Sequence, residues 1–160
     1  MTVQIPGYKI IKTLGKGGMA TVYLATQDIF ERQVALKIMA SSLNEDPSFG
    51  QRFMREAQIV SQLIHPNIVT VYTAGLHENC YYLSMEYIDG NDLKHSRKQL
   101  SFLDKIQVIK EIASALDVSG AKGYVHRDIK PENIMIEAAT KRAVLMDFGI
   151  ARASEPDISV

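Results

Sequence analysis

Several residue types that would point to a particular class of protein are scarce in this sequence of 160 residues. Cys80 is the only cysteine, which excludes a disulfide framework and a cysteine-based metal site. The 18 basic and 18 acidic side chains cancel, so the basic excess typical of nucleic-acid-binding proteins is missing. No apolar run approaches the ~20 residues that span a bilayer, and residues 1–7 do not resemble a signal peptide. We therefore expect a folded cytoplasmic protein without a nucleic-acid partner.

Apolar and β-branched residues, interrupted by polar or glycine-containing turns, predict five strands and one helix in the first part of the chain. The strands are expected over residues 8–14, 21–25, 33–39, 68–76 and 81–87. Between the third and fourth strands, apolar residues recur as on one face of a helix: Phe49, Phe53, Ala57, Val60 and Ile64. The segment His65-Pro66-Asn67 should end this helix, because proline disfavours helical backbone in the residue before it. An α+β lobe is therefore expected over residues 8–88, after an extension over 1–7.

The second part of the chain, residues 89–160, is expected to be mainly helical. The turn signal Asp89-Gly90-Asn91 predicts a hinge and places the boundary between two lobes near residues 87–91. After it, a helix is predicted over residues 102–122 by the helical spacing of Ile106, Ile109, Ala113 and Leu116. Short apolar segments around polar loops follow.

A glycine-rich segment, Gly15-Lys16-Gly17-Gly18-Met19-Ala20, separates the first two strands. Glycines allow the backbone to approach phosphate oxygens with its N–H groups free to donate, although a simple tight turn would look the same. A Walker loop and a dinucleotide-binding fold both need a helix after the glycines, so the strand expected here excludes them. Lys37 closes an apolar strand and could neutralise a phosphate if Glu56 on the helix held it. Considered alone, Lys37 could be a surface lysine whose aliphatic stem covers apolar residues, and Glu56 could be a solvated helix glutamate.

The most informative cluster is His126-Arg127-Asp128-Ile129-Lys130-Pro131-Glu132-Asn133. Asp128 could orient or deprotonate a hydroxyl group, and Lys130 could offset charge on a phosphoryl group. Asn133 could bind Mg²⁺ through its amide oxygen, with Asp147 of the segment Asp147-Phe148-Gly149 as a second ligand. A polar loop and an Asp-x-Gly turn are the simpler explanations, but chance assembly of these residue types in this order is improbable.

Together these segments resemble the protein kinase signature, and the sequence is similar to the bacterial eukaryotic-like serine/threonine kinases from Tyr8 to Arg152. The resemblance implies an α+β, protein-kinase-like fold: a five-stranded antiparallel N-lobe with one helix, then the first part of a mainly helical C-lobe. It implies transfer of the ATP γ-phosphate to serine or threonine hydroxyls of proteins, with ATP and Mg²⁺. The alternative is an ATP-binding or interaction module that no longer transfers phosphate.

The resemblance also implies roles for individual residues. Lys37 would contact the ATP phosphates and be held by Glu56, Asp128 would be the catalytic base, and Lys130 would mark a serine/threonine kinase. Asn133 and Asp147 would hold Mg²⁺. The nucleotide would contact Leu14, Gly15, Lys16, Gly17, Gly18, Met19, Ala20, Val22, Ala35, Lys37, Met85, Glu86, Ile88, Asp92 and Met135. A stack connecting the lobes would contain Val60, Val71, His126 and Phe148.

The sequence departs from the family pattern in two places. Ala20 stands where a third glycine is usual, and a small residue is tolerated there in related bacterial sequences. The chain ends at Val160, just after the activation segment begins, so we expect a truncated domain. Arg127 would normally clamp a phosphate on that segment, where only Ser154 and Ser159 supply hydroxyls. The apolar stripe of the 102–122 helix would then be exposed and able to pair with another chain.

Overall fold

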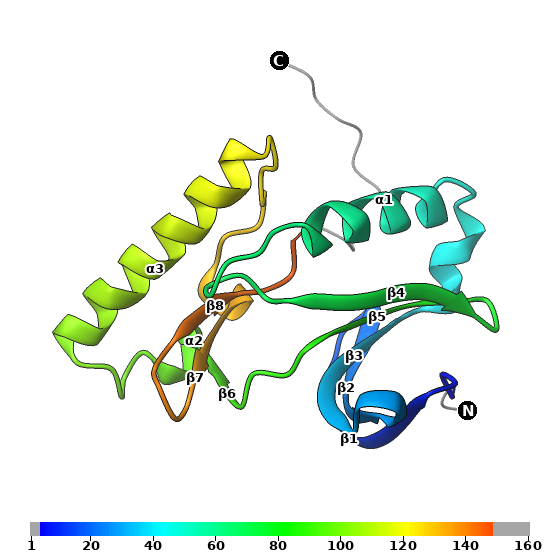
Figure 1. Ribbon diagram of the computed structural model, residues 1–160, viewed down its shortest axis with the longest axis horizontal. Coiled ribbons are helices and arrows are strands. Elements are labelled where there is room, and N and C mark those ends of the chain that lie inside the picture. Colours follow the sequence, from blue (N-terminus) through cyan, green and yellow to red (C-terminus); the bar gives the residue numbers. More distant parts are fainter. Residues whose placement is uncertain (1–3, 149–160) are drawn as a thin grey trace. The chain divides into compact units, whose positions relative to one another are not determined.

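The computed structural model describes residues 4–148, which form two compact units. The first unit contains residues 4–58 and 71–87, and the second contains residues 59–70 and 88–148. Figure 1 shows the sheet of the first unit and the long helix of the second.

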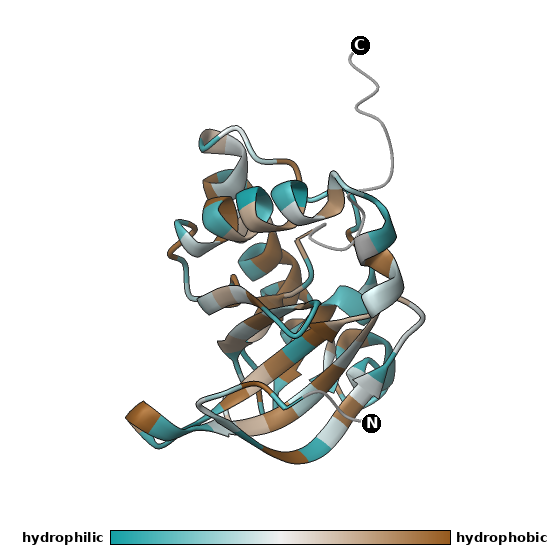
Figure 2. Ribbon diagram, turned by 90° about the vertical axis from the view of Figure 1, so that its right-hand side faces the viewer, coloured by the Kyte–Doolittle hydropathy of each residue, from teal (hydrophilic) through white to brown (hydrophobic). Residues whose placement is uncertain are grey.

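The first unit is built on a five-stranded sheet. Its strands are β1 (Tyr8–Lys16), β2 (Ala20–Gln27), β3 (Arg32–Met39), β4 (Val71–His77) and β5 (Cys80–Glu86), with the short 3-10 turns η1 (Asp28–Phe30) and η2 (Ser41–Glu45). The order is β1-β2-β3-β5-β4 and all neighbours are antiparallel. Figure 2 shows hydrophobic and hydrophilic residues interspersed along the strands, and the central strand β3 has consecutive buried residues, Val34, Ala35 and Leu36. The predicted antiparallel five-stranded lobe is confirmed.

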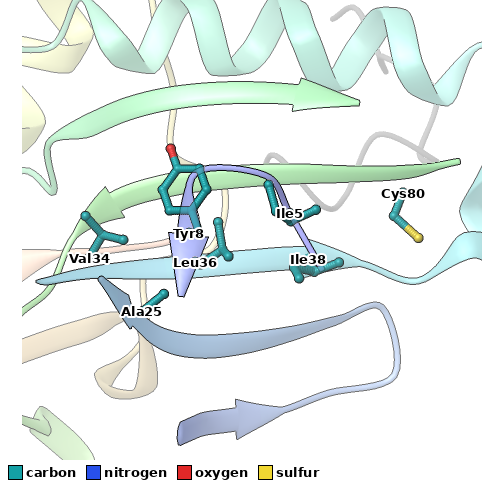
Figure 3. Packing of buried hydrophobic residues seen from close by; sticks show 7 residues of the cluster. All are labelled: Ile5, Tyr8, Ala25, Val34, Leu36, Ile38 and Cys80. Atoms are coloured by element: carbon teal, nitrogen blue, oxygen red, sulfur yellow. The ribbon is translucent and has the colours of Figure 1, made fainter. Parts of the chain in front are cut away.

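One face of this sheet carries a hydrophobic cluster (Figure 3), which consists of Ile5, Tyr8, Ala25, Val34, Leu36, Ile38 and Cys80. Val34, Leu36 and Ile38, alternate residues of β3, belong to it, in keeping with the two-residue period of a strand. Ile5 lies in the segment that the sequence suggested was only an extension, yet it is fully buried. Ile5 therefore packs into the core of the sheet.

Helix α1 (Phe49–Ser61) buries Phe49, Phe53, Ala57 and Val60 as predicted. The prediction for Ile64 is wrong, because its side chain is 90% exposed and Leu63 is buried instead. The helix ends at Ser61, and the next two amides bond three residues back: Gln62 N–H donates to the Ile59 carbonyl and Leu63 N–H to the Val60 carbonyl. This tighter turn changes the angular spacing and moves the apolar position from residue 64 to residue 63.

The second unit contains a small antiparallel sheet, β6-β7-β8, and two helices. The elements are β6 (Gly90–Asp92), α2 (Leu93–Ser96), α3 (Phe102–Ala121), the 3-10 turn η3 (Pro131–Asn133), β7 (Ile134–Glu137) and β8 (Ala143–Leu145). The turn predicted at Asp89-Gly90-Asn91 is wrong for its last two residues, which form β6. Gly90 is needed there because a Cβ atom would lie 1.9 Å from the Ile136 carbonyl oxygen.

Residues 67–69 pair with β8 at the edge of the small sheet, although a continuous strand over 68–76 was predicted. The Val69 N–H donates to the Leu145 carbonyl, and the Leu145 N–H donates to the Asn67 carbonyl. The Asn67 amide also donates to the Ala143 carbonyl. Pairing with β8 thus removes these residues from the large sheet, where β4 begins only at Val71.

Helix α3 has apolar residues on two faces. A capping box formed by Ser101 and Asp104 fixes its start. The face buried within the unit consists of Val108, Ile112, Ala115 and Ser119. The stripe identified in the sequence lies on the other face, where Ile109 is 68% exposed, and the expectation of an exposed apolar stripe is met there.

We predict that Gly90→Ala lowers the free energy of unfolding by about 1–3 kcal/mol, because the new methyl group overlaps the Ile136 carbonyl. Gly120→Ala is the matched control: it lies in α3, where a Cβ atom meets nothing within 4 Å, and it should be neutral or stabilising by up to about 1 kcal/mol. Denaturant unfolding measures both. Equal stabilities of the two variants would contradict the close approach at β6.

Candidate active site

His126 is the buried anchor of the loop between α3 and β7. Its Nε2 lies 2.8 Å from the Met146 carbonyl oxygen, and its Nδ1 accepts the Asp128 N–H at 3.2 Å. These two bonds require a neutral ring with the proton on Nε2. Burial lowers the pKa of His126 below the usual 6.5, although the Met146 carbonyl and the carboxylates of Asp128 and Asp147 act in the opposite direction. The ring therefore ties the residue before Asp147 to Asp128.

The Asp128 carboxylate is held by two neighbours within the same loop. The Asn133 amide group donates to the Asp128 backbone carbonyl and to its Oδ2, both at 2.8 Å. The Lys130 ammonium lies 3.0 Å from the same Oδ2. Asn133 is buried and Asp128 is half-buried, so the amide can fix the carboxylate while part of it stays accessible. The predicted catalytic residues Asp128 and Lys130 are thus brought together with the predicted metal ligand Asn133.

Two residues of this site have left-handed backbone conformations. Arg127 has φ of 62° and Asp147 has φ of 48°. Such conformations cost about 1–3 kcal/mol for most residues other than glycine and are common at functional sites. Both adjoin the hydrogen-bonded cluster, which holds them in place. The residue types of the motifs did not predict the left-handed backbone at these two positions.

The register of the β7–β8 hairpin explains how Asn133 and Asp147 come near each other. Ile134 pairs with Leu145, so the start of β7 and the end of β8 lie at the same end of the hairpin. The Met146 N–H donates to the Asn133 carbonyl at 2.8 Å and continues this pairing by one residue on each side. Asn133, just before β7, and Asp147, two residues after β8, therefore lie at the same end of the hairpin.

The side chains of Asn133 and Asp147 offer the hard oxygen ligands that Mg²⁺ prefers. With the Asn133 NH₂ group bonded to Asp128, its amide oxygen is the atom left for a cation. Among residues 4–148, no group of three or more His, Cys, Asp and Glu side chains could hold a metal on its own. One amide and one carboxylate would instead need phosphate oxygens and water to complete the coordination of Mg²⁺.

Phe148 packs directly on this loop and is 1% exposed. Its ring centroid lies 4.7 Å from that of His126 and 5.7 Å from that of Tyr124, whose hydroxyl donates to the Phe148 carbonyl. Two members of the predicted four-residue stack are therefore in contact, and the complete stack with Val60 and Val71 stays a prediction. Gly149, Arg152, Ser154 and Ser159 lie outside the described residues.

The first unit holds the predicted phosphate-binding segment at the β1–β2 turn. Gly15, Gly17 and Gly18 are exposed, none has a left-handed φ, and a Cβ atom at any of them would meet nothing closer than 3.6 Å. Neither the backbone conformation nor a neighbouring atom of the chain therefore requires glycine here. Phosphate binding by this segment therefore stays a prediction.

Strand register positions the other predicted nucleotide contacts of the first unit. Val22 on β2 is opposite Lys37 on β3, and Ala35 on β3 is opposite Met85 on β5. Lys37 and Glu56 are both half-buried, and their pairing stays a prediction. The other predicted contacts in this unit are Leu14, Lys16, Met19 and Ala20 along the β1–β2 turn and Glu86 at the end of β5.

The second unit carries the remaining predicted nucleotide contacts. Asp92 on β6 pairs with Met135 on β7, which joins two residues 43 positions apart in the sequence. Ile88 is buried just before β6. Asp92 is also the N-cap of α2, a role that the sequence analysis did not identify.

The antiparallel five-stranded sheet with one helix, together with the β7–β8 hairpin, defines the class of protein: it has the protein kinase fold. The family model described as the protein kinase domain matches residues 8–159. The chain therefore belongs to the protein kinase domain family.

Individual relatives agree with this assignment. Serine/threonine-protein kinase PknJ of Mycobacterium tuberculosis is 41% identical over 152 residues, covering 92% of this chain and 26% of that protein. PknB of the same species is 44% identical over 153 residues, and PrkC of Bacillus subtilis is 42% identical over 149 residues, with 24% and 23% of those proteins covered. The chain thus spans about a quarter of the length of these curated relatives.

Solved structures share the fold. The M. tuberculosis PknI kinase domain superposes with a TM-score of 0.81 at 32% identity, covering 96% of this chain and 62% of that one. The apo form of PpkA-294 has a TM-score of 0.83 at 23% identity and supports the fold alone. No helix within residues 4–148 has both the length and the apolar character needed to cross a membrane.

We predict that the His126 ring titrates below pH 6.5 in the folded chain, because burial disfavours its charged form. The unfolded chain then binds the proton more readily, so the contribution of the neutral ring to stability is full above pH 6.5 and is lost as pH falls through the lower, folded pKa. An NMR titration of the histidine ring protons measures this directly. A His126 pKa at or above 6.5 would contradict the proposed tautomer and its two hydrogen bonds.

Proposed function

We propose that the chain transfers the γ-phosphate of ATP to serine or threonine hydroxyls of proteins and uses Mg²⁺. The observation that carries the proposal is the hydrogen-bonded set of Asp128, Lys130 and Asn133. Phosphoryl transfer needs an oriented hydroxyl and compensation of phosphate charge more than it needs covalent chemistry. A carboxylate fixed by a buried amide, with an ammonium group beside it, supplies both.

In the proposed step, the Asp128 carboxylate accepts the hydrogen bond of the acceptor hydroxyl and orients its oxygen toward the γ-phosphorus. A bond forms between that oxygen and the phosphorus, the bond to the ADP oxygen breaks, and the hydroxyl proton passes to Asp128. Lys130 offsets the negative charge on the transferring group. Asn133 and Asp147 would hold Mg²⁺, which supplies further compensation of phosphate charge when bound.

The nucleotide contacts of the proposal come from both units. Lys37 would bind the α- and β-phosphates, with Glu56 holding its ammonium group, and the backbone of residues 15–20 would donate to phosphate oxygens. Asp92 would accept hydrogen bonds from the ribose. Lys130 favours serine and threonine acceptors, in keeping with the names of the relatives. Because ATP is the co-substrate, the proposal places this activity in the cytoplasm.

We predict that Asp128→Asn lowers the rate of phosphate transfer by about 10²–10⁴-fold, because the amide cannot accept the proton. Asp117→Asn, an exposed position on α3, serves as the control for a lost carboxylate and should transfer normally. The assay follows labelled phosphate from Mg·ATP into the chain itself and into a generic protein acceptor. Binding of Mg·ATP by the wild-type chain without any transfer would favour the alternative, a nucleotide-binding module.

We further propose that two copies of the chain associate through the exposed apolar face of α3. This face consists of Phe102, Leu103, Ile106 and Ile109; Ile106 follows Phe102 and Leu103 by about one helical turn, and Ile109 follows Ile106 by another. A groove of about 570 Å³ adjoins it. Its lining consists of four apolar residues, Leu93, Val108, Ile109 and Pro131, and three cationic residues, Arg97, Lys98 and Lys105. None of the predicted site residues lines this groove. A twofold axis brings the same patch of both copies together, so a second copy can cover this apolar face with its own.

We predict that Ile109→Asp keeps the chain monomeric at concentrations where the wild type associates, because the carboxylate would be buried in the interface. Ile29→Asp changes an equally apolar, 83% exposed residue of η1 and should leave association unchanged. Sedimentation velocity over a range of concentrations measures this. A wild-type sedimentation coefficient that does not change with concentration would refute the proposed interface.

A further inference from the structure

The carboxylate of Asp92, the residue before helix α2, caps the start of that helix. Its Oδ1 accepts the backbone N–H of His95 at 2.9 Å, the standard arrangement of an N-cap aspartate. Asp92 also lies in β6, opposite Met135. Two backbone contacts therefore position Asp92: the pairing of β6 with β7 and the hydrogen bond from the His95 N–H.

The His95 ring makes a second set of contacts with the same carboxylate. Its Nδ1 lies 2.7 Å from Oδ1 and 2.9 Å from Oδ2 of Asp92. Although partial burial of Asp92 acts in the opposite direction, the hydrogen bonds from His95 lower the pKa of that carboxyl below its usual value. The ring thus contacts both carboxylate oxygens, which also accept backbone hydrogen bonds from Lys94 and His95.

The His95 ring is a replaceable partner. Its side chain is 73% exposed, whereas that of Asp92 is only 23% exposed. The neighbouring cation, Lys94, is directed to Glu132 instead, with its Nζ 2.9 Å from the Glu132 carboxylate. Because the backbone cap remains when the ring moves, displacing the ring frees an acceptor without unwinding α2.

We infer that His95 is a positioning residue that occupies the Asp92 carboxylate in the absence of nucleotide and competes there with the ribose hydroxyls of ATP. The inference rests on the proposed function, in which Asp92 contacts the ribose. A ribose hydroxyl donates to a carboxylate in the same way as the ring N–H. Where a ribose hydroxyl takes the place of the ring N–H at this carboxylate, the energy of the ring contact is subtracted from ribose binding.

The test uses the complete 160-residue chain and titration calorimetry with two probes, Mg·ATP and its 2′,3′-dideoxy analogue. His95→Ala removes the ring and keeps the backbone N–H that caps α2. It should tighten Mg·ATP binding by about two- to fivefold, the range for an exposed charge-assisted hydrogen bond, and leave the dideoxy analogue unchanged. Arg97→Ala, an exposed change at the end of α2, is the control and should alter neither affinity. Asp92→Asn should abolish most of the difference between the two probes.

The outcomes separate this inference from the function on which it rests. A wild-type chain that prefers Mg·ATP to the analogue, with His95→Ala unchanged, weaker, or shifted equally for both probes, would overturn the role of His95 alone. Equal binding of both probes by the wild type would overturn the ribose contact of Asp92 and this inference with it. A folded wild-type chain that binds neither probe would overturn the proposed function as well.

Discussion

The backbone of β8 is the constraint on which the second unit depends. All three of its residues are fully buried, so each backbone polar group needs a partner within the protein. The Ala143 N–H donates to the Glu111 side chain on α3, and the Ala143 carbonyl accepts from Asn67. Leu145 exchanges two further bonds with residues 67 and 69, while Val144 is opposite Met135 on β7. A helix, a loop and a hairpin are thereby fixed to one three-residue strand, and the strand leads directly into Met146 and Asp147.

Two histidines repeat one device in the loops around this strand. In each, Nδ1 accepts the backbone N–H of the residue two positions later: Asn67 for His65 at 3.1 Å, and Asp128 for His126 at 3.2 Å. The other ring nitrogen contacts a different segment, the Ser114 hydroxyl in one case and the Met146 carbonyl in the other. The first histidine sets Asn67 against β8, and the second sets Asp128 beside Asn133. A His-x-Asn or His-x-Asp sequence therefore works here as a local turn that orients the last residue.

Local pattern predicted the elements of this chain well and failed where distant segments compete for the same residues. Alternation and helical spacing located the five strands, α1 and α3, because those signals depend only on neighbouring residues. The same spacing misplaced Ile64, and it extended the fourth strand over residues that instead pair with β8. Gly90 looked like a turn residue, although its role is to let β6 approach the Ile136 carbonyl. These features depend on tertiary pairing, which a single sequence does not display.

For the candidate site too, the sequence identified the residues but not the contacts between them. The motif letters identified Asp128, Lys130, Asn133 and Asp147, but not the amide bonds that join them or the left-handed backbone of Arg127 and Asp147. The burial of each group indicates which contacts hold the site together. The Lys94–Glu132 pair is exposed, and Lys130 is exposed beside the half-buried Asp128, so solvent weakens both ion pairs. Asn133 is buried, and leaving a buried polar group without its partner costs about 1–3 kcal/mol. The geometry of Asp128 therefore depends more on a neutral amide than on the charges around it.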